Sequence, residues 1–313
     1  MITRPNNKDY DEMLDVWEAS VRSSHSFLTE DDIIFYKPLI RYEYFLSVDL
    51  YVIRNNAGRI AAFLGLSRNM IEMLFVHPEE QGRGYGKELM VFAVKEKSLL
   101  KVDVNEQNIF ARGFYEHLGF RVASRDEKDS IGKPFPILHM EYTPCLYTER
   151  TLLRPFCSND LESLFLCCRN PKLGNNAGWK PHESIEESYI ILHEYFMKQP
   201  SVWAIVRDEA LIGSVGLVPD PKRNNPYVRM LGYWLCEEEW GKGYMSEVVS
   251  QIIEYGYGRL ELSLITANCY PENQRSKSLL LRQGFVSEAT LHQAELTYDG
   301  RVLDHECFYL PKR

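Results

Sequence analysis

The sequence predicts an α/β (α+β) protein of two similar units, each with a mixed sheet flanked by helices. The length of 313 residues corresponds to about two domains at ~150 residues each. Landmark residues of the first half also recur in the same order in the second half. Within each half, helical and strand patterns alternate only in the middle, which favours a mixed sheet over a doubly wound parallel one.

Composition and charge exclude some classes of protein. Hydrophobic residues make up 45% of the chain and charged residues 26%, as in ordinary globular proteins. Lys and Arg total 36 against 44 Asp and Glu, a net charge of −8, so nucleic acid is not an expected partner. No run approaches the ~20 apolar residues of a membrane helix, so no membrane partner is expected either.

The cysteines and the polar start of the chain predict a cytoplasmic protein. Seven cysteines form no C-x-x-C pair, so neither a disulfide framework nor a metal site is expected. Cys167 and Cys168 end a largely apolar run and are interpreted as small core side chains. The segment Met1–Tyr10 is polar and lacks the apolar core of a secretion signal.

An internal repeat sets the expected domain boundaries. The offset between matching landmarks grows slowly along the chain, as it would for one unit copied twice with small insertions. The matching pairs are Arg4-Pro5 with Arg154-Pro155, Gly84-Tyr85 with Gly243-Tyr244, and Gly119-Phe120 with Gly284-Phe285. Thr143-Pro144 interrupts a strand pattern. We therefore expect one domain at residues 1–143 and another at 147–313.

The elements of the first half follow from periodicity and turn residues. Runs of β-branched and aromatic residues bounded by Asn, Gly or Pro predict strands, and apolar residues three or four apart predict helices. The expected strands are 50–54, 60–66, 71–76, 102–104, 120–124 and 137–142. The expected helices are 84–97 and 108–117.

The second half repeats this order. Its expected strands are 202–206, 211–218, 228–235, 262–267, 286–297 and 302–310, and its expected helices are 243–257 and 273–283.

A glycine-rich turn in the first half is suited to binding phosphate. The turn lies between a strand and a helix, so its backbone N–H groups and the helix N-terminus can face one anion. Its residues are Gln81, Gly82, Arg83, Gly84, Tyr85, Gly86 and Lys87. A Walker loop would need Gly in place of Gln81 and Ser or Thr in place of Glu88. A dinucleotide fingerprint would need Gly in place of Lys87.

The turn closely resembles the coenzyme A diphosphate loop of the GNAT acetyltransferase superfamily, with the pattern Gln/Arg-x-x-Gly-x-Gly/Ala. A second signature, from Asn108 through Ala111, Phe114 and Tyr115 to Gly119-Phe120, resembles the helix that follows in that superfamily. The resemblance implies two GNAT-type domains, each a mixed, mostly antiparallel sheet flanked by helices. It also implies that acetyl-CoA is the cofactor.

The two halves resemble different branches of the superfamily. Ser23–Leu28, Val104–Asn108 and Gly132–Pro136 resemble the YjaB type, which implies that Asn105 and Asn108 lie at the coenzyme. The second half resembles the RimJ/RimL type of acetyltransferase for protein N-terminal amines. The segments that carry this second resemblance are Tyr147–Pro155, Gly232–Leu235, Trp240–Met245 and Pro271–Ser276.

The resemblance implies a set of coenzyme contacts in each half. In the first half these are Leu74, Phe75, Val76, Gln81, Gly82, Arg83, Gly84, Tyr85, Gly86, Lys87, Asn105, Asn108 and Tyr115. In the second half they are Trp234, Leu235, Trp240, Gly241, Lys242, Gly243, Tyr244, Met245, Asn273 and Ser276. The backbone of Leu74–Val76, and of Tyr233–Leu235 in the second half, is expected to bind the acetyl oxygen where the sheet splays.

Acetyl transfer to an amine needs a neutral amine, a polarised carbonyl and a proton for the leaving thiolate. The resemblance gives Tyr115 the role of general acid, with packing of its ring as the alternative. Glu72, on the strand before the splay, and His25, on a loop over the acceptor, are the candidate bases. A solvated edge charge is the alternative for Glu72.

The second half departs from this pattern. Leu280 stands at the position of Tyr115, which leaves Ser276 as the nearest hydroxyl. Leu231 stands among the residues where an acidic side chain is usual. Possible bases late in the chain, each weighed against plain surface charge, are Glu288, Glu295, Asp304 and His305.

The sequence therefore predicts an acetyl-CoA-dependent N-acetyltransferase. The expected acceptor is a primary amine of a small molecule or of a protein N-terminus, under the loops Ser23–Asp32 and Asn170–Pro181. The alternative is that one domain, more so the second, binds acyl-CoA without turnover. Nothing in the pattern indicates an oligomeric state or one particular acceptor.

Overall fold

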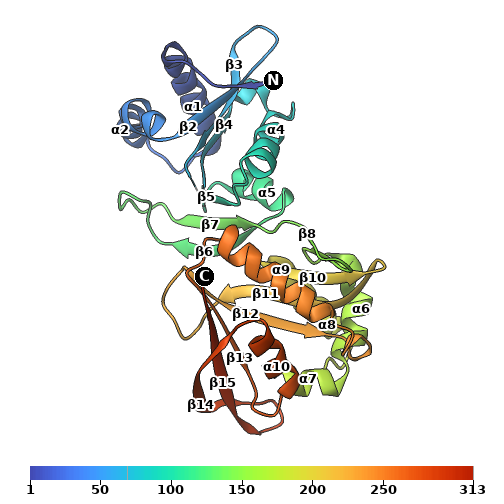
Figure 1. Cartoon of the computed structure of the whole chain (residues 1–313). Coiled ribbons are helices and arrows are strands. Elements are labelled where there is room, and N and C mark those ends of the chain that lie inside the picture. The colour runs from blue at the N-terminus through green and yellow to red at the C-terminus, as the bar shows by residue number, and fades with distance from the viewer. Residues whose placement is uncertain (69, 313) are drawn as a thin grey trace. The chain divides into compact units, whose positions relative to one another are not determined.

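The computed structural model describes residues 1–68 and 70–312. The chain divides into two compact units, Met1–Tyr142 and Thr143–Arg313. Each unit has its own sheet and its own helices (Figure 1).

The sheet of the first unit has the strand order β1-β2-β3-β4-β5-β7-β6. The strands are β1 (Ile2–Thr3), β2 (Asp49–Arg54), β3 (Ile60–Leu66), β4 (Ile71–Val76), β5 (Lys101–Asn105), β6 (Phe120–Asp126) and β7 (Ile137–Tyr142). β4 and β5 pair in parallel, and the other described pairs are antiparallel. The predicted mixed, mostly antiparallel sheet is confirmed.

Helices cover both faces of this sheet (Figure 1). They are α1 (Tyr10–Ser24), α2 (Glu30–Leu39), α3 (Phe45–Ser47), α4 (Tyr85–Val91) and α5 (Ile109–His117). Met13 and Trp17 of α1 pack with Phe63 in one core, and Leu89 of α4 packs with Leu64 in the other. β3 is therefore buried on both faces, which explains its continuous apolar run.

The sheet of the second unit has the order β14-β15-β13-β12-β11-β10-β9-β8. Its strands are β8 (Leu146–Tyr147), β9 (Leu152–Arg154), β10 (Val202–Arg207), β11 (Ala210–Pro219), β12 (Val228–Leu235), β13 (Leu264–Cys269), β14 (Val286–Leu296) and β15 (Val302–Pro311). Only β12 and β13 are parallel among the described pairs. Both sheets thus have one parallel pair, between the strands that flank the glycine turn and its helix.

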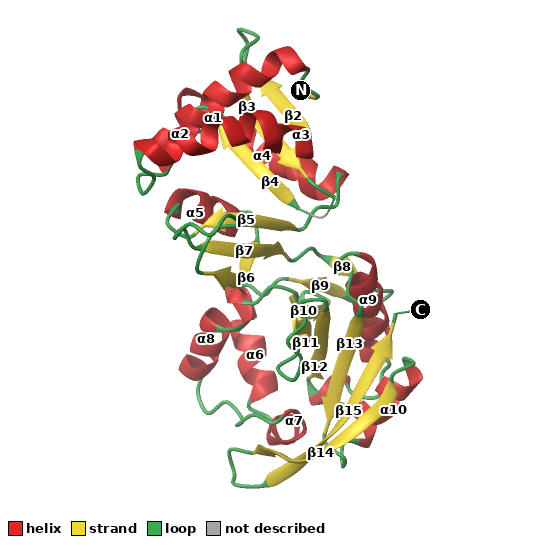
Figure 2. Cartoon of the chain, turned by 90° about the vertical axis from the view of Figure 1, so that its left-hand side faces the viewer, coloured by secondary structure: helices red, strands yellow, loops and turns green. Residues whose placement is uncertain are grey.

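In the second unit, α6 and α8 cover one face of the sheet and α9 covers the other (Figure 2). Its helices are α6 (Leu161–Cys168), α7 (Pro171–Ala177), α8 (Ile185–Glu194), α9 (Tyr244–Gly258) and α10 (Gln274–Arg282). The helices α1, α2, α3, α6, α7 and α8 are not among the predicted elements. α7 occupies most of Asn170–Pro181, which the sequence analysis treats as a loop. Apolar residues at Met13, Trp17 and Val21 have helical spacing and are the signal for α1.

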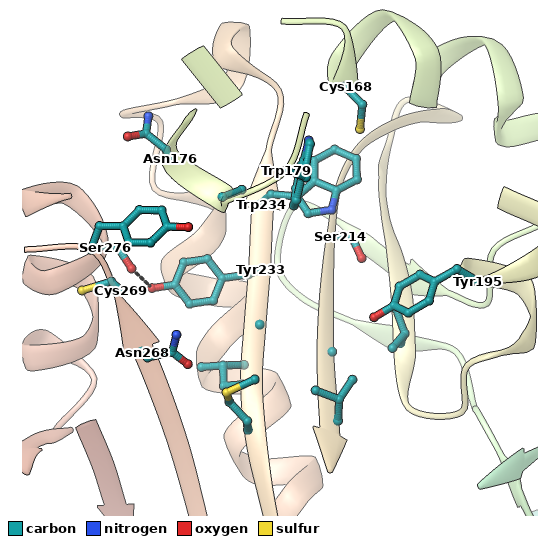
Figure 3. A pocket seen from close by; sticks show the side chains of 18 of the residues that line it. Cys168, Asn176, Trp179, Tyr195, Ser214, Tyr233, Trp234, Asn268, Cys269 and Ser276 are labelled. Carbon is teal, nitrogen blue, oxygen red and sulfur yellow. Dashed lines mark hydrogen bonds between the residues drawn. The ribbon is translucent and has the colours of Figure 1, made fainter. Parts of the chain in front are cut away.

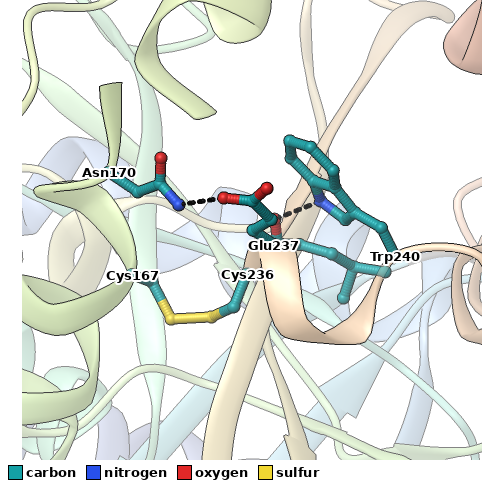
Figure 4. Close-up of a disulfide and its surroundings, with 6 residues drawn as sticks. Cys167, Asn170, Cys236, Glu237 and Trp240 are labelled. Carbon is teal, nitrogen blue, oxygen red and sulfur yellow. Dashed lines mark hydrogen bonds between the residues drawn. A yellow bond between two sulfur atoms is a disulfide. The ribbon is translucent and has the colours of Figure 1, made fainter. Parts of the chain in front are cut away.

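One cysteine pair corrects the sequence analysis. Cys167, in the last turn of α6, forms a disulfide with Cys236, directly after β12 (Figure 4). The expectation that the cysteines form no disulfide is therefore wrong for this pair. Cys167 packs against the core, partly buried, and Cys168 is buried in the core, as expected. The partners are 69 residues apart in sequence, and packing of α6 against the sheet brings their Cα atoms within 5.0 Å. Spacing along the chain does not reveal such a pair.

Candidate active sites

Each sheet opens between its two parallel strands. β4 pairs with β5 at Ile71↔Val102, the one pair described between them. β12 pairs with β13 from Val228↔Leu264 to Leu231↔Ala267. Leu74–Val76 and Tyr233–Leu235 lie beyond these pairs, at the open ends. The strand segments expected to bind the acetyl oxygen are therefore placed where the neighbouring parallel strand has diverged.

The two glycine turns share a left-handed backbone conformation. Gly82 and Gly84 have φ of 77° and 87°, and Gly241 and Gly243 have 75° and 87°, a left-handed conformation that favours glycine. A Cβ atom at Gly82, Gly84 or Gly241 would meet nothing within 4 Å, so the space beside these turns is open. α4 and α9 begin directly after the turns. Their free N–H groups and helix dipoles favour an anion there.

In the first unit the fold brings His25 to the predicted coenzyme residue Asn108. The His25 Nε2 atom lies 3.4 Å from Asn108 Nδ2, and Asn108 Oδ1 accepts a hydrogen bond from Ala111 N at the start of α5. Asn105 ends β5, and its Oδ1 accepts from Gln107 N. These contacts fix the turn between β5 and α5 and place an imidazole beside it.

Tyr115 and Glu72 lie in different surroundings. The Tyr115 ring is buried and packs edge-on against Phe114 and Phe120, at centroid distances of 5.4 and 5.8 Å. Burial raises the pKa of Tyr115, so its phenol is protonated at neutral pH. Glu72 is exposed on β4, between buried Ile71 and Met73. The candidate acid Tyr115 is therefore surrounded by apolar rings, and the candidate base Glu72 is exposed to solvent.

Burial of His25 predicts acid sensitivity of the first unit. Burial lowers the pKa of His25 to about 4 from 6.5, so the unfolded chain binds its proton more readily between these values. The contribution of His25 to the free energy of unfolding is fully present above pH ~6.5 and is lost as the pH falls toward and through ~4. The loss is up to about 1.4 kcal/mol per pH unit.

Urea unfolding of the full chain at pH 7 and pH 5 should show this loss. His25→Gln should reduce it and His117→Gln, which removes an exposed histidine of α5, should not. An equal pH dependence in His25→Gln would contradict the prediction.

The second unit contains two adjoining cavities. A cavity of about 590 Å³ lies along the glycine turn, lined by Trp240, Gly241, Gly243 and the first turn of α10. A cavity of about 660 Å³ lies on the side of α8, β14 and β15. The residues that line both are Asn176, Ala177, Tyr233, Trp234, Asn273 and Ser276. The cavities therefore meet at the open end of β12.

Ser276 lies at this junction. Asn273 caps α10, with its Oδ1 accepting from Ser276 N at 3.1 Å. Ser276 Oγ lies 2.7 Å from the phenol oxygen of Tyr233 (Figure 3). Leu280, one turn further along the helix, is fully buried in the core. The hydroxyl that faces the junction from α10 is thus that of Ser276.

The structure separates the four late acidic and histidine candidates. Glu295 Oε2 accepts from Tyr270 Oη at 2.9 Å and lies 2.8 Å from His305 Nε2, in the larger cavity. Glu288 instead pairs with Arg223, and Asp304 with His292. Tyr270 was not singled out from sequence, because its partner lies 25 residues further along the chain.

Trp179 also lines the larger cavity. Its indole Nε1 is buried and has no hydrogen-bond partner within residues 1–68 and 70–312. Its ring meets that of Trp234 edge-on, with centroids 6.1 Å apart. Trp179 could not be singled out as a site residue from the sequence, because it is one tryptophan in a segment with no strand or helix pattern.

Comparison with known proteins shows the family to which the chain belongs. Two family models, both described as acetyltransferase (GNAT) domain, match residues 42–143 and 150–286. The peptidyl-lysine N-acetyltransferase YjaB of Escherichia coli is 33% identical over 45% of this chain and 95% of its own length. The chain belongs to the GNAT acetyltransferase family. It is therefore an N-acetyltransferase, and acetyl-CoA is its cofactor.

Other relatives match comparable lengths. The uncharacterized N-acetyltransferase p20 of Bacillus licheniformis is 30% identical over 54% of this chain and 96% of its own length. The ribosomal-protein-serine acetyltransferase of Escherichia coli is 26% identical over 49% of this chain and 88% of its length. The solution structure of apo-YjaB from Escherichia coli has a TM-score of 0.43 with 33% identity, and covers 45% of this chain and 96% of that one.

These matches confirm the tandem GNAT arrangement expected from sequence, with relatives of the YjaB type and among ribosomal-protein acetyltransferases. Within the described part of the chain, no helix is long and apolar enough to cross a membrane.

The glycine turns fit acetyl-CoA in both units. A diphosphate needs backbone N–H groups and room for close approach. The four glycines are left-handed, a Cβ at Gly82, Gly84 or Gly241 would meet nothing within 4 Å, and a helix begins directly after each turn. In the second unit the cavity beside the turn leads to the junction at Ser276. Bound acetyl-CoA would supply an acetyl thioester with an electrophilic carbonyl carbon.

Proposed function

We propose that residues 1–143 and 147–313 form two separate acetyl-transfer sites, each acting on a primary amine. The observation that carries this for the second domain is the meeting of its two cavities at Tyr233 and Ser276. One cavity follows the glycine turn, and the other is lined by the carboxylates of Glu187 and Glu295. For the first domain, support comes from the open end of β4, the Gly84 turn and buried Tyr115.

In the second domain, Glu295 would take the proton from the acceptor amine. It lines the larger cavity, where the hydrogen bond from Tyr270 and the contact with His305 fix its Oε2. Backbone N–H groups at the open end of β12 would hold the acetyl oxygen, and Ser276 Oγ would donate the proton that the leaving sulfur needs. In the first domain, Tyr115 would donate that proton, with His25 or Glu72 as base.

The acceptors proposed for the two domains differ in basicity. An α-amine has a pKa of ~7.7–8.0 and a lysine amine ~10.4, a gap of about 3.5 kcal/mol in the cost of deprotonation at ~1.36 per unit. YjaB is named a peptidyl-lysine acetyltransferase, and two relatives from Escherichia coli are named for serine and alanine of ribosomal proteins. We propose lysine-like amines for the first domain and α-amines of peptides or small molecules for the second.

We propose that the protein acts in the cytoplasm. Five of the described cysteines are free thiols, as is usual for a reducing compartment, and one pair forms the disulfide.

The function of the second domain is tested in the full chain with Gly84→Glu, which blocks the first coenzyme site. Transfer to a peptide α-amine is measured from pH 6.5 to 9. Glu295→Gln should lower kcat/KM about tenfold near pH 8 and more at lower pH, where fewer amines are neutral. Glu288→Gln, which removes a carboxylate paired with Arg223, is the matched control. Coenzyme binding without any transfer would instead indicate a purely acyl-CoA-binding domain, and an unchanged rate in Glu295→Gln would exclude that residue as base.

A further inference from the structure

The contact between Tyr233 and Ser276 joins two elements that are far apart in sequence. Tyr233 extends from the open end of β12, and its phenol oxygen lies 2.7 Å from Ser276 Oγ in the first turn of α10 (Figure 3). Both side chains line both cavities. A hydrogen bond at the place where coenzyme and acceptor would meet determines where the hydroxyl protons point.

The direction of this hydrogen bond follows from the chemistry of its neighbours. A serine hydroxyl has one proton and two lone pairs, so it can accept from Tyr233 and still donate elsewhere. Burial raises the pKa of Tyr233, so the phenol keeps its proton and is available as a donor. The Cys269 thiol also lies beside Ser276, and burial raises the pKa of that thiol to about 11. It is therefore not an anion that would capture the serine proton.

We propose that Tyr233 is a positioning residue that donates to Ser276 Oγ and thereby turns the Ser276 proton toward the junction of the two cavities. The inference rests on the proposed function, in which Ser276 is the proton donor. The first domain would use a phenol on helix α5, Tyr115. The second domain has Leu280 at that helix position. Its phenol is that of Tyr233 on β12, which acts through Ser276.

The protons and electrons balance without a further reactant. Ser276 Oγ gives its proton to the sulfur as the C–S bond breaks and the new C–N bond forms, and the electron pair of the C–S bond stays on sulfur. The proton lost by the amine nitrogen goes to Glu295. Exchange with solvent then returns a proton to Ser276 and removes one from Glu295. Tyr233 keeps its own proton throughout.

A double-mutant cycle tests the proposal in the full chain carrying Gly84→Glu. Tyr233→Phe should lower kcat about tenfold to 100-fold, within the range of general acid catalysis, and leave the Kd for acetyl-CoA within about twofold. Ser276→Ala should lower kcat at least as much. The double variant should be no slower than Ser276→Ala, because Tyr233 acts only through that hydroxyl.

A binding measurement gives a readout independent of turnover. Calorimetry compares coenzyme A with its desulfo analogue, which lacks the sulfur that would accept the Ser276 proton. The unmodified second site should prefer coenzyme A about threefold to tenfold, the value of one hydrogen bond. Tyr233→Phe and Ser276→Ala should both lose this preference. Tyr227→Phe, which alters an exposed tyrosine just before β12, should keep it.

The outcomes separate this inference from the proposed function. If Ser276→Ala is slow but Tyr233→Phe keeps both its rate and its preference for coenzyme A, the positioning role is overturned and the function stands. Tyr233 would have only a structural role under two conditions. The losses in kcat of Tyr233→Phe and Ser276→Ala would add up in the double variant, and Tyr233→Phe would bind coenzyme A and its desulfo analogue equally more weakly. An unchanged rate in Ser276→Ala would remove the serine from the proposed chemistry.

Discussion

The Gly243→Glu chain is expected to bind one acetyl-CoA where the unmodified chain binds two, and Gly84→Glu should have the same effect on the other site. Both glycines have φ of 87°, and a side chain in this conformation costs roughly 1–2 kcal/mol. At Gly243 a Cβ would also lie 3.2 Å from Arg150 Nη2. The added carboxylate would stand where a diphosphate must approach the backbone. We expect affinity at the altered site to fall at least ~100-fold, because charge repulsion adds to the loss of N–H contacts.

Calorimetry with acetyl-CoA checks this prediction by stoichiometry. Gly58→Glu and Gly300→Glu are matched controls. Both glycines have positive φ, of 78° and 84°, and a Cβ at either would meet nothing within 4 Å. Both lie in hairpin turns and outside the two glycine turns that precede α4 and α9. They carry the same strain and charge and should leave two sites intact. A single acetyl-CoA site in the unmodified chain would contradict the prediction that each unit has its own coenzyme site.

Tyr115→Phe is expected to lower kcat of the first domain by ~10²–10⁴-fold with little change in the Kd for acetyl-CoA. The substitution keeps the ring that packs between Phe114 and Phe120, so folding should be preserved. It removes only the phenol hydroxyl, which is protonated at neutral pH because the pKa of a tyrosine is ordinarily about 10 and burial raises that of Tyr115 further. A proton for the leaving sulfur matters in the transition state and not for coenzyme binding.

The measurement uses the full chain with Gly243→Glu, so that turnover comes from the first site. A lysine-containing peptide is the acceptor, and thiol release reports the rate. Tyr42→Phe, which changes an exposed tyrosine of the same unit, is the control. If Tyr115→Phe retained full kcat with chemistry limiting the rate, the residue would have only a packing role.

Local chemistry in the sequence was enough to predict the elements around the two glycine turns. Left-handed turns select glycine, so Gly84 and Gly243 mark the strand-to-helix turns directly in the sequence. Asn108 and Asn273 cap the next helices through a hydrogen bond three residues away, which is again a local pattern. The repeat of these patterns predicted two similar units and the mixed sheets.

The sequence by itself therefore determined the family, the two-unit arrangement and the position of each glycine turn, because these depend on residues close together along the chain. Only the tertiary structure decided which two of the four late candidates, Glu295 and His305, share a cavity with Ser276. Glu295 and Glu288 lie on the same strand, yet one contacts His305 and the other Arg223. Cys167 and Cys236, and Tyr233 and Ser276, likewise meet through strand pairing and helix packing. Such contacts join residues tens of positions apart, and no local spacing rule encodes them.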